Sequence, residues 1–279
     1  MKPLLISLFL IFSITLRSYS QTGKLDLAKE SLKQQNSSNN STTSSSTKVS
    51  NNRVKDENPF LEELALFMVK ISFGLAYQIG VESYFEKDRN MHSADFSKYP
   101  YKEPYLGNYV YKDSTNSETI FRVDIASNFV YESKKLFGNN LSLNLKFARR
   151  FDLEVGSLQL FEKVSNNTDN FSLYHAMLNY HRIRTQEFDL WFGLGVNYVA
   201  NNVNEAGFSY GLGSEWFLNK PLSILVTFNG TTINNRPVNK TRLLLKYYIN
   251  NFNISTGYEH YSLGVSKIDA YSIGLGASF

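Results

Sequence analysis

One histidine in the sequence has an acidic residue at a spacing that could support acid–base chemistry. Pairing Ile183 with Glu187 across the short segment "RTQ" (184–186) places His181 opposite Asp189. An imidazole held in orientation by a carboxylate is the base of many hydrolases. No serine is clearly placed beside this pair, and the sequence contains no cysteine. We therefore expect no catalytic residues, and a lipid-modifying hydrolase is only the third candidate function.

Three Gly-x-Gly motifs raise the question of nucleotide binding. They occur in "FGLGVNY" (192–198), "YGLGSEW" (210–216) and "IGLGASF" (273–279). Nucleotide-binding glycines connect a strand to a helix, whereas these lie inside segments of alternating polarity. Glycine within a strand instead permits bending or the close approach of another segment. We expect no cofactor, and no metal because no cluster of side chains has ligand spacing.

Composition limits the class of protein further. The net charge of +4 is mild, and no basic stripe interleaves with aromatic residues, so no nucleic-acid partner is expected. The absence of cysteine excludes a disulfide scaffold. Aromatic residues make up 15% of a chain whose mean hydropathy is −0.29. Apolar and polar surface must therefore be interleaved.

The candidate residues lie in segments that alternate apolar and polar positions. The last one, "AYSIGLGASF" (270–279), has Tyr271, Ile273, Leu275 and Phe279 on one parity and glycine and serine on the other. Such alternation predicts a strand with one apolar face. Similar segments are 119–132, 141–148, 151–162, 171–183, 187–200, 207–218, 222–233, 240–249 and 252–262. Strands at 71–85 and 105–112 would raise the total from ten to about twelve, which is the number we favour.

The connections between these segments alternate in length. "ARR", "RTQ", "NKP" and "NN" are short, whereas "SKKLFGNN", "KVSNNTDN", "NNVNEA", "NNRPVNK" and "GVSKID" are longer. An antiparallel up-and-down transmembrane β-barrel has tight turns at one end and longer loops at the other. A soluble β-sandwich is the alternative, but its crossings give no reason for this alternation. The sequence therefore predicts an all-β barrel over 71–279.

The N-terminal part is expected to contain three further segments. Residues 1–20 have the positive start, apolar stretch and small residues of a secretory signal peptide, with a membrane anchor as the alternative. Residues 21–58 form a Ser/Asn-rich linker that we expect to be disordered and periplasmic, except for a transient helix in "LDLAKESLKQ". Residues 59–70 predict a short helix that is a candidate plug, although 64–81 also has nearly the length of a spanning helix.

The signal peptide, the strand series and the terminal Phe279 together resemble Gram-negative outer-membrane β-barrel proteins. The resemblance implies that Tyr271, Ile273, Leu275 and Phe279 form the signal read by the barrel-assembly machinery. It also implies location in the outer membrane, contact with outer-membrane lipid, and a C-terminus on the periplasmic side.

The inward parity of such a barrel carries charges of both signs. Arg242 opposite Glu259 and Lys146 opposite Asp152 join the His181–Asp189 pair as expected cross-strand partners. Paired charges filling a narrow lumen favour a structural barrel or a porin-like channel for small polar solutes. A surface barrel for adhesion or complex formation is the alternative, because the segment 88–109 is long and rich in Tyr and Pro. The lumen-facing set comprises Glu82, Arg122, Asp124, Lys146, Asp152, Glu154, His181, Asp189, Glu215, Arg242, Lys246 and Glu259.

Overall fold

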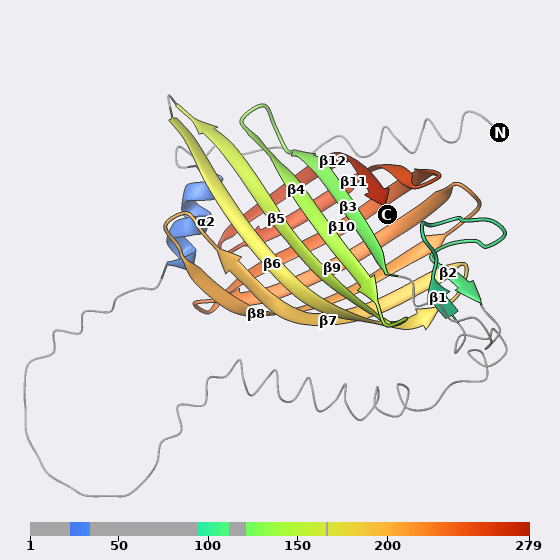
Figure 1. Cartoon of the computed structure of the whole chain (residues 1–279). Coiled ribbons are helices and arrows are strands. Elements are labelled where there is room, and N and C mark those ends of the chain that lie inside the picture. Colours follow the sequence, from blue (N-terminus) through green and yellow to red (C-terminus); the bar gives the residue numbers. More distant parts are fainter. Residues whose placement is uncertain (1–22, 34–93, 112–120, 166) are drawn as a thin grey trace, which may run out of the picture.

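Ten antiparallel strands form a closed barrel in the computed structural model, which describes residues 23–33, 94–111, 121–165 and 167–279. Each strand pairs with its neighbours in sequence, and the last pairs with the first (Figure 1). The expected up-and-down topology is therefore confirmed. The strands are β3 (Arg122–Tyr131), β4 (Leu136–Phe147), β5 (Phe151–Val164), β6 (Asn167–Arg184), β7 (Phe188–Val199), β8 (Glu205–Phe217), β9 (Leu222–Ile233), β10 (Arg236–Ile249), β11 (Phe252–Leu263) and β12 (Ser266–Ser278).

The favoured number of about twelve strands is wrong, and the alternative of ten is the number observed. The backbone N–H and C=O of Phe279 both bond to Val123, so β12 closes directly onto β3. No edge is left there for another strand. The expected strand at 71–85 and the expected helix at 59–70 lie outside the described residues, as do the signal peptide and Glu82.

The expected long loops are mostly parts of strands. β5 and β6 are separated only by 165–166, and β9 and β10 only by Asn234 and Asn235. Both asparagines have positive φ, of 50° and 60°. Asparagine tolerates this left-handed conformation, which two-residue hairpin turns require. Asn234 and Asn235 therefore form a tight turn, and connection length does not distinguish the two ends of the barrel.

The outer wall of the barrel is apolar and carries two belts of aromatic rings. One belt crosses β4 to β7 through Phe147, Phe151, Tyr180 and Phe192, with successive ring centroids 5.4–6.3 Å apart. The other crosses β3 to β5 through Phe129, Phe137 and Phe161, with spacings of 6.4 and 6.0 Å. Ten residues of β5 separate the belts, which is about 33 Å of strand and about 25 Å of height at a tilt of about 40°.

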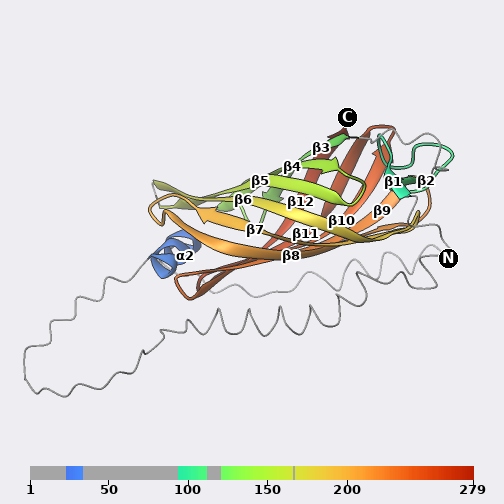
Figure 2. The same ribbon diagram turned by 60° about the horizontal axis from the view of Figure 1, so that its bottom comes forward.

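A short helix, α2 (Lys24–Leu32), closes one end of the barrel, called here the helix end (Figure 2). Leu25, Ala28 and Leu32 lie on one helix face, are fully buried, and pack into an apolar cluster of inward residues from several strands. The structure places a helix where the sequence predicts a transient one, and docking on the barrel supplies the burial that an isolated short helix lacks. Among the described residues no helix is long and apolar enough to cross a membrane.

The opposite end, called here the hairpin end, is covered by residues 94–111 (Figure 1). This segment contains β1 (Ala94–Phe96) and β2 (Tyr109–Tyr111), which pair only with each other. The strand expected at 105–112 is therefore not part of the barrel wall. Ala94, Phe96 and Tyr109 are buried in a small cluster of their own.

Candidate functional site in the barrel lumen

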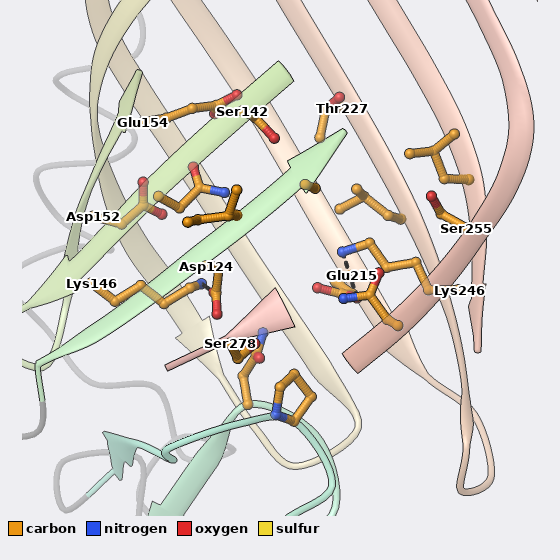
Figure 3. Close-up of a pocket in the computed structure, with 18 of the residues that line it drawn as sticks. Asp124, Ser142, Lys146, Asp152, Glu154, Glu215, Thr227, Lys246, Ser255 and Ser278 are labelled. Carbon is orange, nitrogen blue, oxygen red and sulfur yellow. Dashed lines mark hydrogen bonds and ion pairs between the residues drawn. The ribbon is translucent and has the colours of Figure 1, made fainter. Parts of the chain in front are cut away.

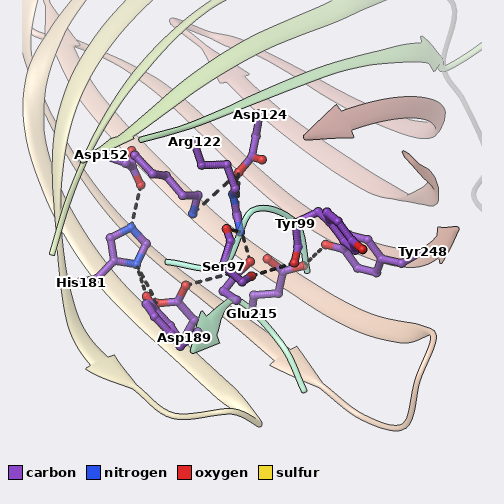
Figure 4. Close-up of polar contacts among 12 residues, drawn as sticks. Ser97, Tyr99, Arg122, Asp124, Asp152, His181, Asp189, Glu215 and Tyr248 are labelled. Carbon is purple, nitrogen blue, oxygen red and sulfur yellow. Dashed lines mark hydrogen bonds and ion pairs between the residues drawn. The ribbon is translucent and has the colours of Figure 1, made fainter. Parts of the chain in front are cut away.

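His181 on β6 lies at the centre of a polar network at the hairpin end. Its Nε2 is 2.7 Å from Asp152 Oδ2 on β5, and its Nδ1 is 2.7 Å from Asp189 Oδ1 on β7 (Figure 4). All three side chains are buried. When both carboxylates are ionised, only the imidazolium can donate to both, because neutral imidazole has a single N–H. With that protonation the group is a carboxylate–imidazolium–carboxylate bridge across three strands.

Two residues of the segment 94–111 complete the surroundings of Asp189. The Tyr109 hydroxyl donates to Oδ1 at 2.8 Å, and Asn108 Nδ2 donates to Oδ2 at 3.1 Å. Burial, reinforced by the Asp189 charge, raises the pKa of Tyr109 well above its usual range, so the phenol stays protonated. Both ring nitrogens of His181 face carboxylates, so neither is open to a substrate.

Arg122 on β3 joins the barrel wall to the same segment. Its guanidinium donates to Asp124 at 2.8 Å, to Asn108 Oδ1 at 2.9 Å and to the Ser97 carbonyl at 3.2 Å (Figure 4). Lys146 Nζ lies 4.0 Å from Asp124 on the other side. The hairpin end is therefore held shut by charge-assisted hydrogen bonds, which are stronger than neutral ones.

Glu215 on β8 gathers a second group of donors. Its Oε1 accepts from Tyr248 at 2.7 Å, from Ser223 at 2.7 Å and from Lys246 at 3.2 Å. These partners come from β9 and β10, so the carboxylate links three adjacent strands from the inside.

Two further carboxylates lie toward the helix end. Glu154 is 3.2 Å from His175 Nε2 and 3.7 Å from Arg242. Glu259 accepts from Asn140 at 3.0 Å and from the Tyr261 hydroxyl. Apart from Glu82, every residue of the expected lumen set therefore lies inside the barrel. The side-chain contacts given above for this set join residues of the barrel to each other or to the segment 94–111.

Two of the three expected cross-strand registers are confirmed. Arg242 is directly opposite Glu259, and Lys146 is directly opposite Asp152. The third is wrong, because an irregularity between His181 and Ile183 shifts the pairing and leaves Arg184 opposite Asp189. The His181–Asp189 contact forms nevertheless.

A polar cavity of about 90 Å³ remains between these groups (Figure 3). A single water needs about 10–15 Å³, so several waters fit, whereas pockets for small organic ligands measure about 300–1,000 Å³. Among the described residues the cavity therefore has room for several waters but is smaller than a pocket for an organic ligand. Its lining includes Asp124, Ser142, Lys146, Glu154, Glu215 and Lys246.

The inward glycines make room for side chains of neighbouring strands. A Cβ on Gly213 would overlap the ring of Trp191, and one on Gly193 would overlap the Asn179 amide. Trp191 in turn packs 5.3 Å from the His181 ring. The glycines thus serve close approach within the barrel wall.

Sequence reasoning missed several members of the network. No sequence pattern indicates that Asn108, Tyr109 and Arg184 belong to it, because their partners become neighbours only when 94–111 folds into the barrel mouth.

A second histidine–carboxylate pair, His260 with Asp269 at 2.6 Å, lies on the outer wall and is partly exposed. Within the described ranges, no three His, Asp or Glu side chains are placed to hold a metal ion.

No known protein family matches the sequence, and no curated protein matches it significantly. Among solved structures, the chain is similar to the COG4313 outer membrane channel of Pseudomonas putida F1, with a TM-score of 0.36, 9% identity, and coverage of 61% of this chain and 100% of that one. It is also similar to the outer membrane protein Ail of Yersinia pestis, with a TM-score of 0.33, 16% identity, and coverage of 57% of this chain and 100% of that one. For the outer membrane protein OprG of Pseudomonas aeruginosa, the TM-score is 0.30, the identity 14%, and the coverage 57% of this chain and 95% of that one.

Proposed function

We propose that the protein is an outer-membrane β-barrel that holds a pathway for small polar solutes closed with its own chain. Its wall suits a bilayer because exposed apolar residues cover the strands between two aromatic belts. Their separation of about 25 Å matches the apolar band of outer-membrane barrels. Tyr271, Ile273 and Leu275 on β12 and Phe279 directly after it are 58–67% exposed, as a lipid-facing terminal strand requires.

One observation carries the closed state: a polar cavity with room for only a few waters lies between two covered mouths. Open porins of this architecture have sixteen or more strands and a wide aqueous lumen. Here the lumen has ten strands around it and paired charges within it. A continuous pathway would require one of the two closing segments to move.

A structural barrel without transport is the second candidate. The carboxylates Asp152, Asp189 and Glu215 each have charged or hydrogen-bonding partners within the wall or the segment 94–111. Such a network stabilises the barrel even if nothing passes through it.

The adhesion alternative was suggested by the long segment 88–109, which is rich in Tyr and Pro, and the structure gives this segment little support as a surface loop. The described part of the segment 88–109 folds into the barrel mouth, where Phe96, Tyr101 and Tyr109 are buried. The hydrolase alternative also gains no support, because His181 has no free ring nitrogen. Our proposal therefore contains no catalytic step.

A disulfide lock on α2 tests whether the helix end is the gate. A Cβ built on Gly264 lies 3.2 Å from Ser31 Cβ, near the Cβ–Cβ distance of about 3.8 Å in disulfides. The sequence has no cysteine, so a bridge in Ser31→Cys with Gly264→Cys can form only between these two residues; because Gly264 has a φ of +61°, which strains any other residue, heat-modifiable migration must first show a folded barrel. In planar bilayers we expect no conductance when it is oxidised and wild-type behaviour after reduction, with each single cysteine variant as a control.

The complementary variant releases the helix. Leu25→Ala with Leu32→Ala removes two fully buried side chains that anchor α2, and each such loss costs about 2–5 kcal/mol. We expect frequent channel openings from this protein once heat-modifiable gel migration shows a folded barrel. A folded but silent double variant would contradict the channel and favour the structural barrel.

A further inference from the structure

One lysine in the barrel lumen is buried without a hydrogen bond. Lys240 on β10 is 5% exposed, and its Nζ has no hydrogen-bond partner among the described residues. The charges of Glu154 and Glu259 attract it, but neither carboxylate accepts a hydrogen bond from it. The next inward residue, Val238, belongs to the apolar cluster beneath α2. An ammonium group in such a place is costly unless a nearby group compensates its charge.

A small cavity lies beside the Lys240 side chain. Its volume is about 20 Å³, and it shares Glu154, Thr227 and Arg242 with the larger cavity of Figure 3. Since one water needs about 10–15 Å³, the small cavity has room for one water or one monatomic ion. Sulfate and phosphate, with five heavy atoms each, are too large for it.

The side chains that line the small cavity carry more positive than negative charge. Lys240 and Arg242 are the cations of the lining, and Glu154 is its one carboxylate. Glu154 already lies 3.2 Å from His175 Nε2 and 3.7 Å from Arg242. Glu259 is described but does not belong to the lining. The charge balance therefore favours an anion over a cation in this cavity.

Two further residues of the lining offer N–H donors. Arg242 donates from Nε to the Thr227 hydroxyl at 3.0 Å, which leaves N–H groups of the guanidinium for a ligand. Asn229 accepts at Oδ1 from Ser209 at 2.8 Å, and its Nδ2 donates to the sulfur of Met177. A thioether is a weak acceptor, and the amide has a second N–H. Lysine, arginine and amide donors thus converge on one small space.

We propose that this cavity binds one halide-sized anion between Lys240 Nζ, the Arg242 guanidinium and the Asn229 amide. The anion compensates the buried ammonium charge and accepts the hydrogen bonds that the protein groups leave unmade. The inference goes beyond the proposed function, because such a site stabilises the folded barrel whether or not a solute passes through it.

Crystals of the purified protein grown in sodium bromide test the position of the site, since bromide has an anomalous X-ray signal. We expect an anomalous peak within hydrogen-bond distance of Lys240 Nζ. Bromide on the outer surface alone would be an adventitious ion only. A water between Lys240 and Glu259 in place of bromide would show that the two residues compensate each other. Either of these results would overturn the proposal.

Urea unfolding in micelles tests the site in solution. Sodium chloride is compared with sodium gluconate at equal ionic strength, because gluconate is too large for the cavity and screening of surface charges is then equal. Where chloride is present at about ten times its dissociation constant, we expect the unfolding equilibrium constant of wild type to be about tenfold lower.

Lys240→Met removes the ammonium group but keeps a side chain of similar length, and it should unfold alike in the two salts. The matched control is Lys267→Met, which removes one exposed lysine from β12 and should keep the wild-type response to chloride. General effects of the salts act on both variants, so a chloride response that survives in K240M would contradict the site. If K240M shows no heat-modifiable barrel, the bromide crystals of wild type still decide.

Discussion

Replacing His181 with phenylalanine tests whether the lumen is sealed from water. The new ring retains the volume and the contacts with Phe96 and Trp191, whose ring centres lie 5.2 and 5.3 Å away. It removes the imidazole that bridges Asp152 and Asp189. Two buried carboxylates then face each other without their shared cation.

The expected loss follows from the contacts that remain. Each carboxylate loses one charge-assisted hydrogen bond of 2.7 Å, worth about 1.5–3 kcal/mol. Asn179 still donates to Asp152, and Tyr109 still donates to Asp189. Breaking a buried ion pair typically costs about 3–5 kcal/mol. We therefore expect H181F to lower the free energy of unfolding by about 3–5 kcal/mol.

Urea unfolding of the refolded barrel in vesicles, followed by tryptophan fluorescence, provides the measurement. Trp191 lies inside the barrel near the mutation, and Trp216 lies on the outer wall, 51% exposed. The control is H260F, which breaks a histidine–carboxylate contact of 2.6 Å on the outer wall. An exposed pair contributes at most about 1 kcal/mol, so H260F should be nearly silent.

A rescue variant separates lost charge balance from poor packing. Adding D152N and D189N to H181F removes all three charges, and replacing a whole buried ionic group is often neutral. We expect the triple variant to recover most of the lost stability. If H181F and H260F cost equally little, water screens the network and the sealed-lumen argument is refuted.

Three further predictions concern the wall, the closing strand and the plug. Gly213→Val should displace Trp191 and shift its fluorescence emission. The control Gly230→Val, whose added Cβ would lie 3.0–3.1 Å from atoms of Tyr210 and Phe228, should leave the Trp191 emission unchanged. Emission spectra of both variants in the W216F background provide the measurement. Removing Phe279 should lower the heat-modifiable fraction in cells, because both of its backbone bonds to Val123 are lost, whereas Phe279→Tyr should assemble normally. Glu162→Gln weakens the capping contact to the Leu25 amide and should speed proteolysis within α2 severalfold, and unchanged cleavage would show that this contact does not hold the plug.

The sequence predicted the barrel wall well because its rules are local. Alternation assigned each residue of β12 to its face, and the two-residue turn at 250–251 left one register for Ile249 opposite Phe252. Register failed where a strand irregularity follows His181. No residue type predicts such an irregularity. A shift of one residue changes the cross-strand partner of every residue that follows it in the strand.

The segments that close the barrel could not be predicted in the same way. Residues 94–111 are polar and rich in tyrosine, like an exposed loop, and become buried only through Arg122, Asp189 and His181 inside the barrel. α2 has too few residues to be stable alone, and its burial comes from inward residues of several strands. Strand number was overestimated for a related reason: Tyr109–Tyr111 alternates like a wall strand but pairs with β1.

The chemistry of the two mouths indicates which closure opens first. Withdrawing 94–111 would leave Arg122 without Asn108 and Asp189 without Tyr109, deep in the lumen where unpaired charge is costly. Withdrawing α2 would expose Glu132 and Glu162, which lie near the ends of β3 and β5 where bulk water can reach them. It would also break the ion pairs of Lys24 with Glu132 and of Lys29 with Asp169, and would remove Leu25 and other apolar side chains of α2 from their buried positions. In the proposed channel we therefore expect the helix end to be the gate, since its paired charges lie near the strand ends, and the disulfide lock is placed there to test this.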